Sequence, residues 1–303
     1  MIVFFALLGA LPPQNWVLLT LLAGLAALYD TLFWISHIYI FIEANRDHLD
    51  TGSAVGALEG IRKFASILGP AIGAFILITA GKAPLTIISI IIFSLSIVPL
   101  FKMKHVRDIP AGKRLNFKDF FSSIKEKRNY LSAALLGVHI EAEDTIWPLF
   151  IFLTVGTLEA VAAVPTLVAI TTIVFSFFIG KLTNKHASKM IILGSIFITL
   201  SWILRIIFHD TFLYYATVFL VGFFYLLISL PLDRFTTAHG LEVGSLSVAV
   251  YRNASAMSLR IILYAILAIL VEVFKVSFVV AAACVFMILV VTLLLKPKTQ
   301  KIP

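Results

Sequence analysis

The stretch MIILGSIFITLSWILRII, Met190 to Ile207, decides the fold class of this chain. Its 18 residues include one charged side chain, Arg205. As an α-helix the stretch would be about 27 Å long, which is close to the ~30 Å thickness of the hydrocarbon core of a bilayer. It therefore predicts a transmembrane helix.

Eight further apolar runs of about 18–28 residues have the same character. They are Trp16–Ile42, Ser53–Thr79, Pro84–Phe101, Tyr130–Thr154, Ala160–Ile179, Phe212–Leu230, Gly244–Val271 and Val276–Leu295. A shorter run, Met1–Leu11, is too short to span. The 303 residues are thus predicted to form an all-α, polytopic membrane protein.

The composition agrees, with 60% apolar and 13% charged residues. Soluble proteins have about 45–50% apolar residues and about 25% charged residues. The one cysteine, Cys284, excludes a disulfide framework and a Cys-based metal site within this sequence. We expect neither a metal nor a cofactor.

The placement of positive charge predicts the orientation. If the connection Glu43–Thr51 is cytoplasmic and sides alternate from there, 17 Lys and Arg residues are cytoplasmic, against Lys82 and Lys275 outside. The net charge of +8 is then an orientation signal, and nucleic-acid binding is not needed to explain it. We expect a multi-pass protein of the cell membrane, plasma or inner, with Lys296–Pro303 in the cytoplasm.

The long connection Lys102–Asn129 divides the chain into three predicted parts. These are an incomplete N-terminal bundle (1–101), a basic cytoplasmic linker (102–129) and a C-terminal six-helix bundle (130–303). In the linker, apolar residues at helical spacing predict an amphipathic helix that lies on an anionic leaflet or packs against the protein's own cytoplasmic ends. They are Phe117, Phe120, Phe121 and Ile124.

Two motifs resemble signatures of the major facilitator superfamily. GIRKFASILGPAIGAF resembles the Gly-x8-Gly-Pro-x2-Gly-Gly motif of the family's fifth helix, with matches at Gly60, Gly69, Pro70 and Gly73. GKLTNKHASK resembles the family's loop Gly-x-Leu-x-Asp-Arg-x-Gly-Arg-Lys, with matches at Gly180, Leu182 and Lys189 and a retained charge at Lys185. Asn184 replaces the aspartate of that loop, and it loses a charge–dipole interaction of about 0.3–1 kcal/mol with a neighbouring helix.

The resemblance implies a twelve-helix, monomeric secondary transporter built from two bundles, of which about ten helices are present. In register, Ser53–Thr79 is the fifth helix and Met1–Leu11 the end of the third, so we expect a fragment or a shortened gene product. In the family, helices three, six, nine and twelve form an outer scaffold and the others line a central cavity. The fifth-helix motif is associated with antiporters.

Ionisable residues well inside the predicted spans fall in runs that the resemblance assigns to the cavity. A charge in the bilayer costs several kcal/mol, so such residues usually face water or a partner. They are Asp30; Glu59, Arg62 and Lys63; the cluster near Glu141; and Arg252 and Arg260. We expect Asp30 to line the cavity and the Glu59 group to form a salt-bridge network at the inner gate. His37 is expected at the interface and Trp147 in packing.

The cluster lies in GVHIEAEDTIWPLF, Gly137 to Phe150. At 100° per residue, Glu141 and Asp144 share one helix face, and His139 and Glu143 lie nearly opposite. One pair can therefore face the cavity while the other contacts a neighbouring helix.

Two functions are open for the pair Glu141 and Asp144. Two close carboxylates cannot both ionise easily, so one can load and release protons. Alternatively they neutralise Arg252, Arg260 or Arg62. Arg252 and Arg260, both in the run Gly244–Val271, could instead hold an anionic group. Pro148 weakens this helix because it cannot donate to the Asp144 carbonyl.

No enzyme signature and no Gly-x4-Gly-Lys-Ser/Thr loop is found, so we expect neither catalysis nor ATP-driven pumping. The sequence favours proton-coupled export of a small amphiphilic or anionic solute. Proton-coupled uptake remains an alternative, as does a degenerate, non-transporting scaffold or sensor.

Overall fold

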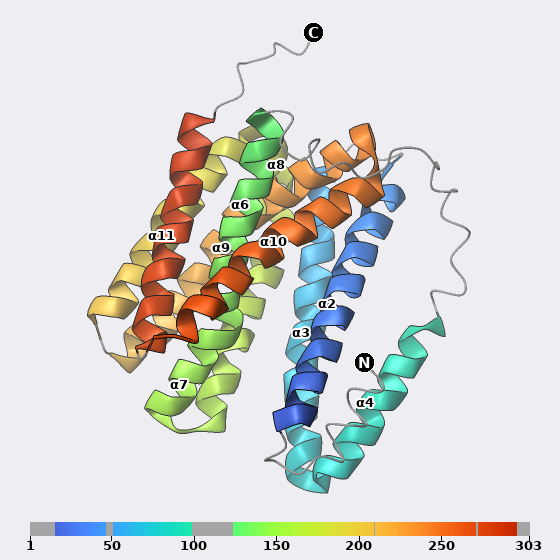
Figure 1. Cartoon of the computed structure of the whole chain (residues 1–303), viewed down its shortest axis with the longest axis vertical. Helices are drawn as coiled ribbons and strands as arrows, with labels where there is room; N and C mark the ends of the chain where they lie inside the picture. Colours follow the sequence, from blue (N-terminus) through green and yellow to red (C-terminus); the bar gives the residue numbers. More distant parts are fainter. Residues whose placement is uncertain (1–15, 47–50, 99–123, 209, 271, 296–303) are drawn as a thin grey trace.

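The computed structural model describes residues 16–46, 51–98, 124–208, 210–270 and 272–295, and all regular secondary structure in these ranges is helical (Figure 1). This confirms the all-α prediction for that part of the chain. Met1–Leu11, most of the basic linker and Lys296–Pro303 lie outside the described residues. The helices are α2 (Trp16–Ala44), α3 (Thr51–Ala80), α4 (Lys82–Ser96), α6 (Ile124–Glu141), η2 (Ala142–Ile146), α7 (Trp147–Val155), α8 (Leu158–Ile207), α9 (Thr211–Val243), α10 (Ser245–Leu267) and α11 (Val273–Leu294).

Each predicted span falls on a helix wherever the structure describes it. Among the described residues, four helices are long and apolar enough to cross a membrane: α2, α8, α9 and α11. α3 and α10 are also long, but each carries charged residues in its middle part. The chain is therefore a membrane-embedded protein with several spanning helices.

The basic segment Gly180–Lys189 is helical, although the motif it resembles is a loop. α8 runs for 50 residues and contains both Ala160–Ile179 and Met190–Ile207. Only His186 leaves helical geometry, with φ −129° and ψ 25°, and this kink separates the two predicted spans. The segment contains no proline, and the Thr183 hydroxyl donates to the Ile179 carbonyl at 2.9 Å, so the helix continues to the kink.

The helix that carries the acidic cluster contains a π-helical turn. η2 joins α6 to α7, and the Trp147 N–H donates to the Ala142 carbonyl, five residues earlier. Pro148, the next residue, has no N–H to donate. The weakness predicted at Pro148 therefore takes the form of a π turn, a rare element that often occurs at functional sites.

The span predicted to end at Leu230 is longer in the structure. α9 begins after Asp210, whose carboxylate accepts a bond from the Leu213 N–H at 2.9 Å, and it continues through Pro231 to Val243. It ends at Gly244, whose φ of 126° is readily accessible to glycine. The extension adds about three turns and makes Asp233 a helical residue.

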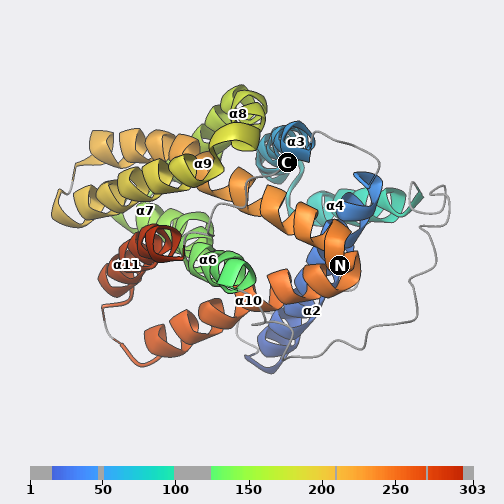
Figure 2. The ribbon, with the colours of Figure 1, turned by 90° about the horizontal axis from the view of Figure 1, so that it is seen from above.

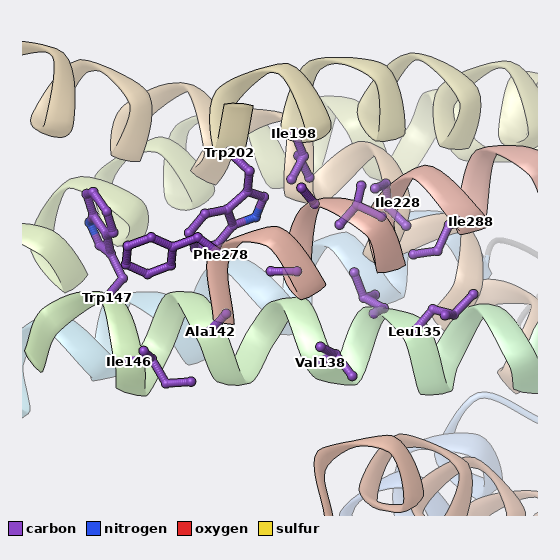
Figure 3. Packing of buried hydrophobic residues seen from close by; sticks show 14 of the residues in the cluster. Leu135, Val138, Ala142, Ile146, Trp147, Ile198, Trp202, Ile228, Phe278 and Ile288 are labelled. Atoms are coloured by element: carbon purple, nitrogen blue, oxygen red, sulfur yellow. The ribbon is translucent and has the colours of Figure 1, made fainter. Parts of the chain in front are cut away.

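The helices form two groups, with α2, α3 and α4 on one side and α6 to α9 and α11 on the other (Figures 1 and 2). α10 runs obliquely from the second group to α2. In the second group, three rings from different helices form an aromatic core (Figure 3). The Phe278 ring of α11 lies 5.3 Å from both the Trp147 ring of α7 and the Trp202 ring of α8. These contacts fix α7, α8 and α11 against one another.

The two groups meet most closely where α3 packs on α8. Small residues spaced four apart face one another across this contact: Gly52, Gly56 and Gly60 on α3, and Ser176, Gly180 and Asn184 on α8. A Cβ on Gly56 would lie 2.6 Å from the Ser176 carbonyl oxygen, and one on Gly180 would lie 2.7 Å from the Gly52 carbonyl oxygen. Close backbone approach through small residues is typical of packed membrane helices.

The other glycines of the fifth-helix motif do not make such an approach. No described atom lies within 4 Å of a Cβ placed on Gly69, and a Cβ on Gly73 would meet only the Leu85 side chain at 3.9 Å. α3 continues across Pro70. Among the described residues of α3, the close approach lies nearer the start of the helix, at Gly52, Gly56 and Gly60.

Candidate functional site

A cavity of about 510 Å³ lies between the two helix groups. Its walls come from α2, α3, α6, η2, α8, α9 and α10, and no lining residue belongs to α4, α11 or the second half of α8. The ionisable lining residues are Asp30, His37, Glu59, Arg62, Lys63, His139, Glu141, Glu143, Asp144, Asp233, Arg252 and Arg260.

Glu143 forms a buried, bidentate ion pair with Arg205 of α8. Arg205 Nη1 lies 2.5 Å from Glu143 Oε2, and Nη2 lies 3.0 Å from Oε1. Arg205 Nε also donates to Thr217 Oγ1 at 2.9 Å. Such geometry can compensate two desolvated charges. Arg205 is the one charged residue of its predicted span, and the sequence analysis did not predict this partner.

Aromatic rings enclose the Arg205 guanidinium. Its Cζ lies 4.0 Å from the centroid of the Trp147 ring and 4.7 Å from that of Trp202. Trp202 Nε1 in turn donates to His139 Nδ1 at 3.0 Å. Because His139 and Glu143 are only 1% and 4% exposed, this face of the helix serves packing, and we do not place substrate contacts there. Trp147 is fully buried, as expected of a packing residue.

Glu141 points toward α10, on the other face. Its Oε2 lies 3.4 Å from Arg260 Nη1, and the Tyr264 hydroxyl donates to its Oε1 at 2.5 Å. Arg260 Nε also donates to the Gly137 carbonyl at 3.1 Å. α6 and α10 come close here, since a Cβ on Gly137 would lie 2.5 Å from the Ala256 carbonyl oxygen. Of the two functions predicted for Glu141, the contacts favour pairing with Arg260.

Asp233 of α9 is a cavity residue that the sequence analysis missed. Its Oδ1 lies 3.4 Å from Arg252 Nη2, so Arg252 pairs with α9 and not with the acidic cluster. The predicted span ends at Leu230, before Pro231 and three residues short of Asp233. An available signal was the continued helical spacing of Asp233 and Thr237, both of which line the cavity.

His37 also lines the cavity, which the sequence analysis did not predict. Its ring stacks on Phe33, with centroids 5.7 Å apart. On the same helix, Trp34 Nε1 donates to Asp30 Oδ1 at 2.9 Å, and the Arg62 guanidinium of α3 lies 5.1 Å from the Trp34 ring centroid. Asp30 thus lies in the cavity wall, as predicted.

The Glu59 group is a local pair and not a bridge between the helix groups. Glu59 Oε2 lies 2.6 Å from Arg62 Nη2, one turn away on α3. A gate would need a partner on the opposite side of the cavity. In the described part of the chain, this pair has none, so the predicted salt-bridge network reduces to a pair within one helix.

Lys63 and Asp144 are left as cavity charges without an ion-pair partner among the described residues. Asp144 is exposed to the cavity and Lys63 is half-buried. They come from α3 and η2, which lie on opposite sides of the cavity. Asp144 is therefore the member of the acidic cluster that remains available to a proton or a solute.

The remaining motif residues lie away from the cavity, at the α8 kink. Asn184, Lys185 and Lys189 are exposed, and Asn184 Oδ1 faces Gly52 of α3. Among the described residues, no three His, Cys, Asp or Glu side chains come together as a metal site. The chain matches no model of a known protein family, and no curated protein matches it.

Proposed function

We propose that this protein is a secondary active transporter that moves a small solute by alternating access, with two helix groups of the major facilitator type rocking about the central cavity. The observation that carries the proposal is the gathering of ionisable residues from both groups into one cavity of a membrane-embedded chain. Charges within a membrane domain usually line a water-filled path.

Asp144 is the proposed proton-coupling residue. It is the exposed carboxylate of the cluster, whereas Arg260 and Tyr264 hold Glu141 and Arg205 holds Glu143. Asp144 also lies in the π turn, where the helix is least regular. A carboxylate on a wall of the cavity can exchange its proton for a solute when the helix groups move, which favours export by antiport.

The test uses the purified full chain in proteoliposomes with a pH-sensitive dye inside and an imposed proton gradient. A panel of amino acids, amines and carboxylates is added from outside. We expect at least one solute to drive proton movement. Asp144→Asn should abolish that movement but leave counterflow of the radiolabelled solute, because counterflow needs no net proton transfer.

Glu242→Gln, which removes an exposed carboxylate at the end of α9, is the matched control and should behave like the wild type. Proton movement that persists in Asp144→Asn would reject this coupling site. A wild-type protein that transports no solute of the panel in either direction would reject transport itself.

The proposal includes an orientation with the α8 kink in the cytoplasm. Lys185 at the kink and Lys275 at the start of α11 are both exposed, so each accepts a cysteine. In intact cells, with Cys284 replaced by Ala, a cysteine at 275 should react with a membrane-impermeant thiol reagent. A cysteine at 185 should react only after permeabilisation. The opposite labelling pattern would reverse the topology.

A further inference from the structure

The ionised groups of the cavity are mostly neutralised by one another. Three arginines that line it each lie beside a carboxylate, and a fourth carboxylate is neutralised from outside the lining. The pairs are Arg62 with Glu59 at 2.6 Å, Arg252 with Asp233 at 3.4 Å, Arg260 with Glu141 at 3.4 Å and Arg205 with Glu143 at 2.5 Å. These groups have little charge left to offer a solute.

Three charged residues, Lys63, Asp144 and Asp30, remain after this pairing in the part of the chain that the structure describes. Lys63 and Asp144 have neither an ion pair nor a side-chain hydrogen bond within the ranges that the structure describes, and they face the same cavity from α3 and η2. Asp30, the other carboxylate without a basic partner there, accepts the Trp34 N–H. The Trp34 N–H is neutral, so Asp30 keeps its charge on α2, in the same helix group as Lys63. Across the two helix groups, the cavity thus presents one unmatched cation, Lys63, opposite one unmatched anion, Asp144.

The charge balance defines what such a cavity can hold. A solute with one charge would neutralise only one of the two residues and would be repelled by the other. Closing the cavity would then bury a charge without a partner, which is strongly unfavourable in a membrane. A solute that carries both an ammonium and a carboxylate group neutralises both residues at once.

We propose that the cavity binds a zwitterionic, amino-acid-like solute, with its ammonium on Asp144 and its carboxylate on Lys63. The volume of about 510 Å³ is that of a small-molecule site. Apolar and aromatic side chains also line it, including Trp34, Phe41 and Leu58, so the solute can carry an apolar body. This inference rests on the proposed transport function and names its substrate class.

This assignment also explains how solute movement is coupled to proton movement. Asp144 holds either a proton or the ammonium group of the solute, because one carboxylate cannot accept both charges together. Entry of the solute displaces the proton, and return of the proton displaces the solute. Competition of this kind for one group produces exchange, in agreement with antiport.

The test measures binding to the purified full chain in lipid nanodiscs by calorimetry. The probes are leucine, 4-aminobutyrate and 6-aminohexanoate as zwitterions of different charge separation. For each, the methyl ester removes the anion and the N-acetyl derivative removes the cation. We expect at least one zwitterion to bind about tenfold or more tightly than both of its derivatives, a difference of about 1.4 kcal/mol.

Variants of Lys63 and Asp144 test which residue binds which charged group of the solute. Lys63→Met should reduce the affinity for the preferred zwitterion to the affinity for its methyl ester. The affinity for the ester itself should not change. Asp144→Asn should reduce the affinity for the same zwitterion to the affinity for its N-acetyl derivative. The exchange of charges in Lys63→Asp/Asp144→Lys should bind the zwitterion more tightly than either single change. Lys185→Met and Glu242→Gln, at exposed positions away from the cavity, should bind as the wild type does.

Equal binding of a zwitterion and either derivative would overturn the proposal, and so would absence of binding by all three zwitterions. If proton-driven flux occurs with solutes of a single charge, the substrate class is wrong but the transport function stands. If a zwitterion binds as expected but no solute crosses the membrane, the transport function fails and the binding site stands.

Discussion

Replacing either Glu143 or Arg205 alone is expected to destabilise the protein by about 3–5 kcal/mol, because each change leaves the other charge buried without its partner. Both side chains are almost fully buried, and Trp147 and Trp202 enclose the guanidinium, so neither charge can reach water. Glu143→Gln and Arg205→Met should therefore unfold in detergent at a much lower temperature than the wild type.

The double change Glu143→Leu/Arg205→Met distinguishes the loss of the whole ion pair from the loss of one partner. It removes both charges and fills similar volume with apolar atoms, so most of the lost stability should return. Lys185→Met serves as the control on the same helix, since an exposed cation contributes about 0–1 kcal/mol. Single variants as stable as the wild type would contradict the buried pair, and so would a double variant as unstable as the sum of its parts.

The second large effect is expected where α3 packs on α8. Gly56→Ala and Gly180→Ala each place a methyl group less than 3 Å from the backbone oxygen of the opposite helix, at 2.6 Å and 2.7 Å. The helices must separate to accept it, at a cost of about 1–3 kcal/mol each. The combined variant should lose both thermal stability and proton-driven flux, because the contact joins the two groups that are proposed to move.

Gly73→Ala provides the matched comparison on α3, since its methyl group would meet only a side chain at 3.9 Å. Alanine is a better helix former than glycine by about 1 kcal/mol, so this variant should be as stable as the wild type or more stable. If Gly56→Ala and Gly73→Ala had the same effect, the close α3–α8 packing would be wrong.

Much of the fold is readable from the sequence because its main signal is local. Long apolar runs such as Trp16–Ile42 predict helices without knowledge of their neighbours, and α2 follows that run closely. The same holds for the two faces of the acidic cluster. Helical periodicity separates Glu141 and Asp144 from His139 and Glu143. All four line the cavity, and only the second pair binds side chains of α8, His139 to Trp202 and Glu143 to Arg205.

The missed features depend on contacts between residues far apart in the sequence. Arg205 pairs with a residue 62 positions away, and no local pattern around Arg205 marks that partner. Asp233 was missed for a different reason, because the proline two residues before it is a common helix stop but lies inside α9. Glu59 and Arg62 form an ion pair between adjacent turns of one helix, and the gate predicted there stays a prediction.

The π turn has a consequence for how this chain is compared with its relatives. It accommodates one extra residue, so every side chain beyond Ile146 is out of phase with α6 by about 100° relative to an uninterrupted α-helix. Trp147 and Ile151 reach the core in this shifted phase, and both are fully buried there. A related chain that keeps the same core without the turn must therefore align with a one-residue gap between Ala142 and Ile146, and an ungapped alignment would pair the wrong faces of the helix.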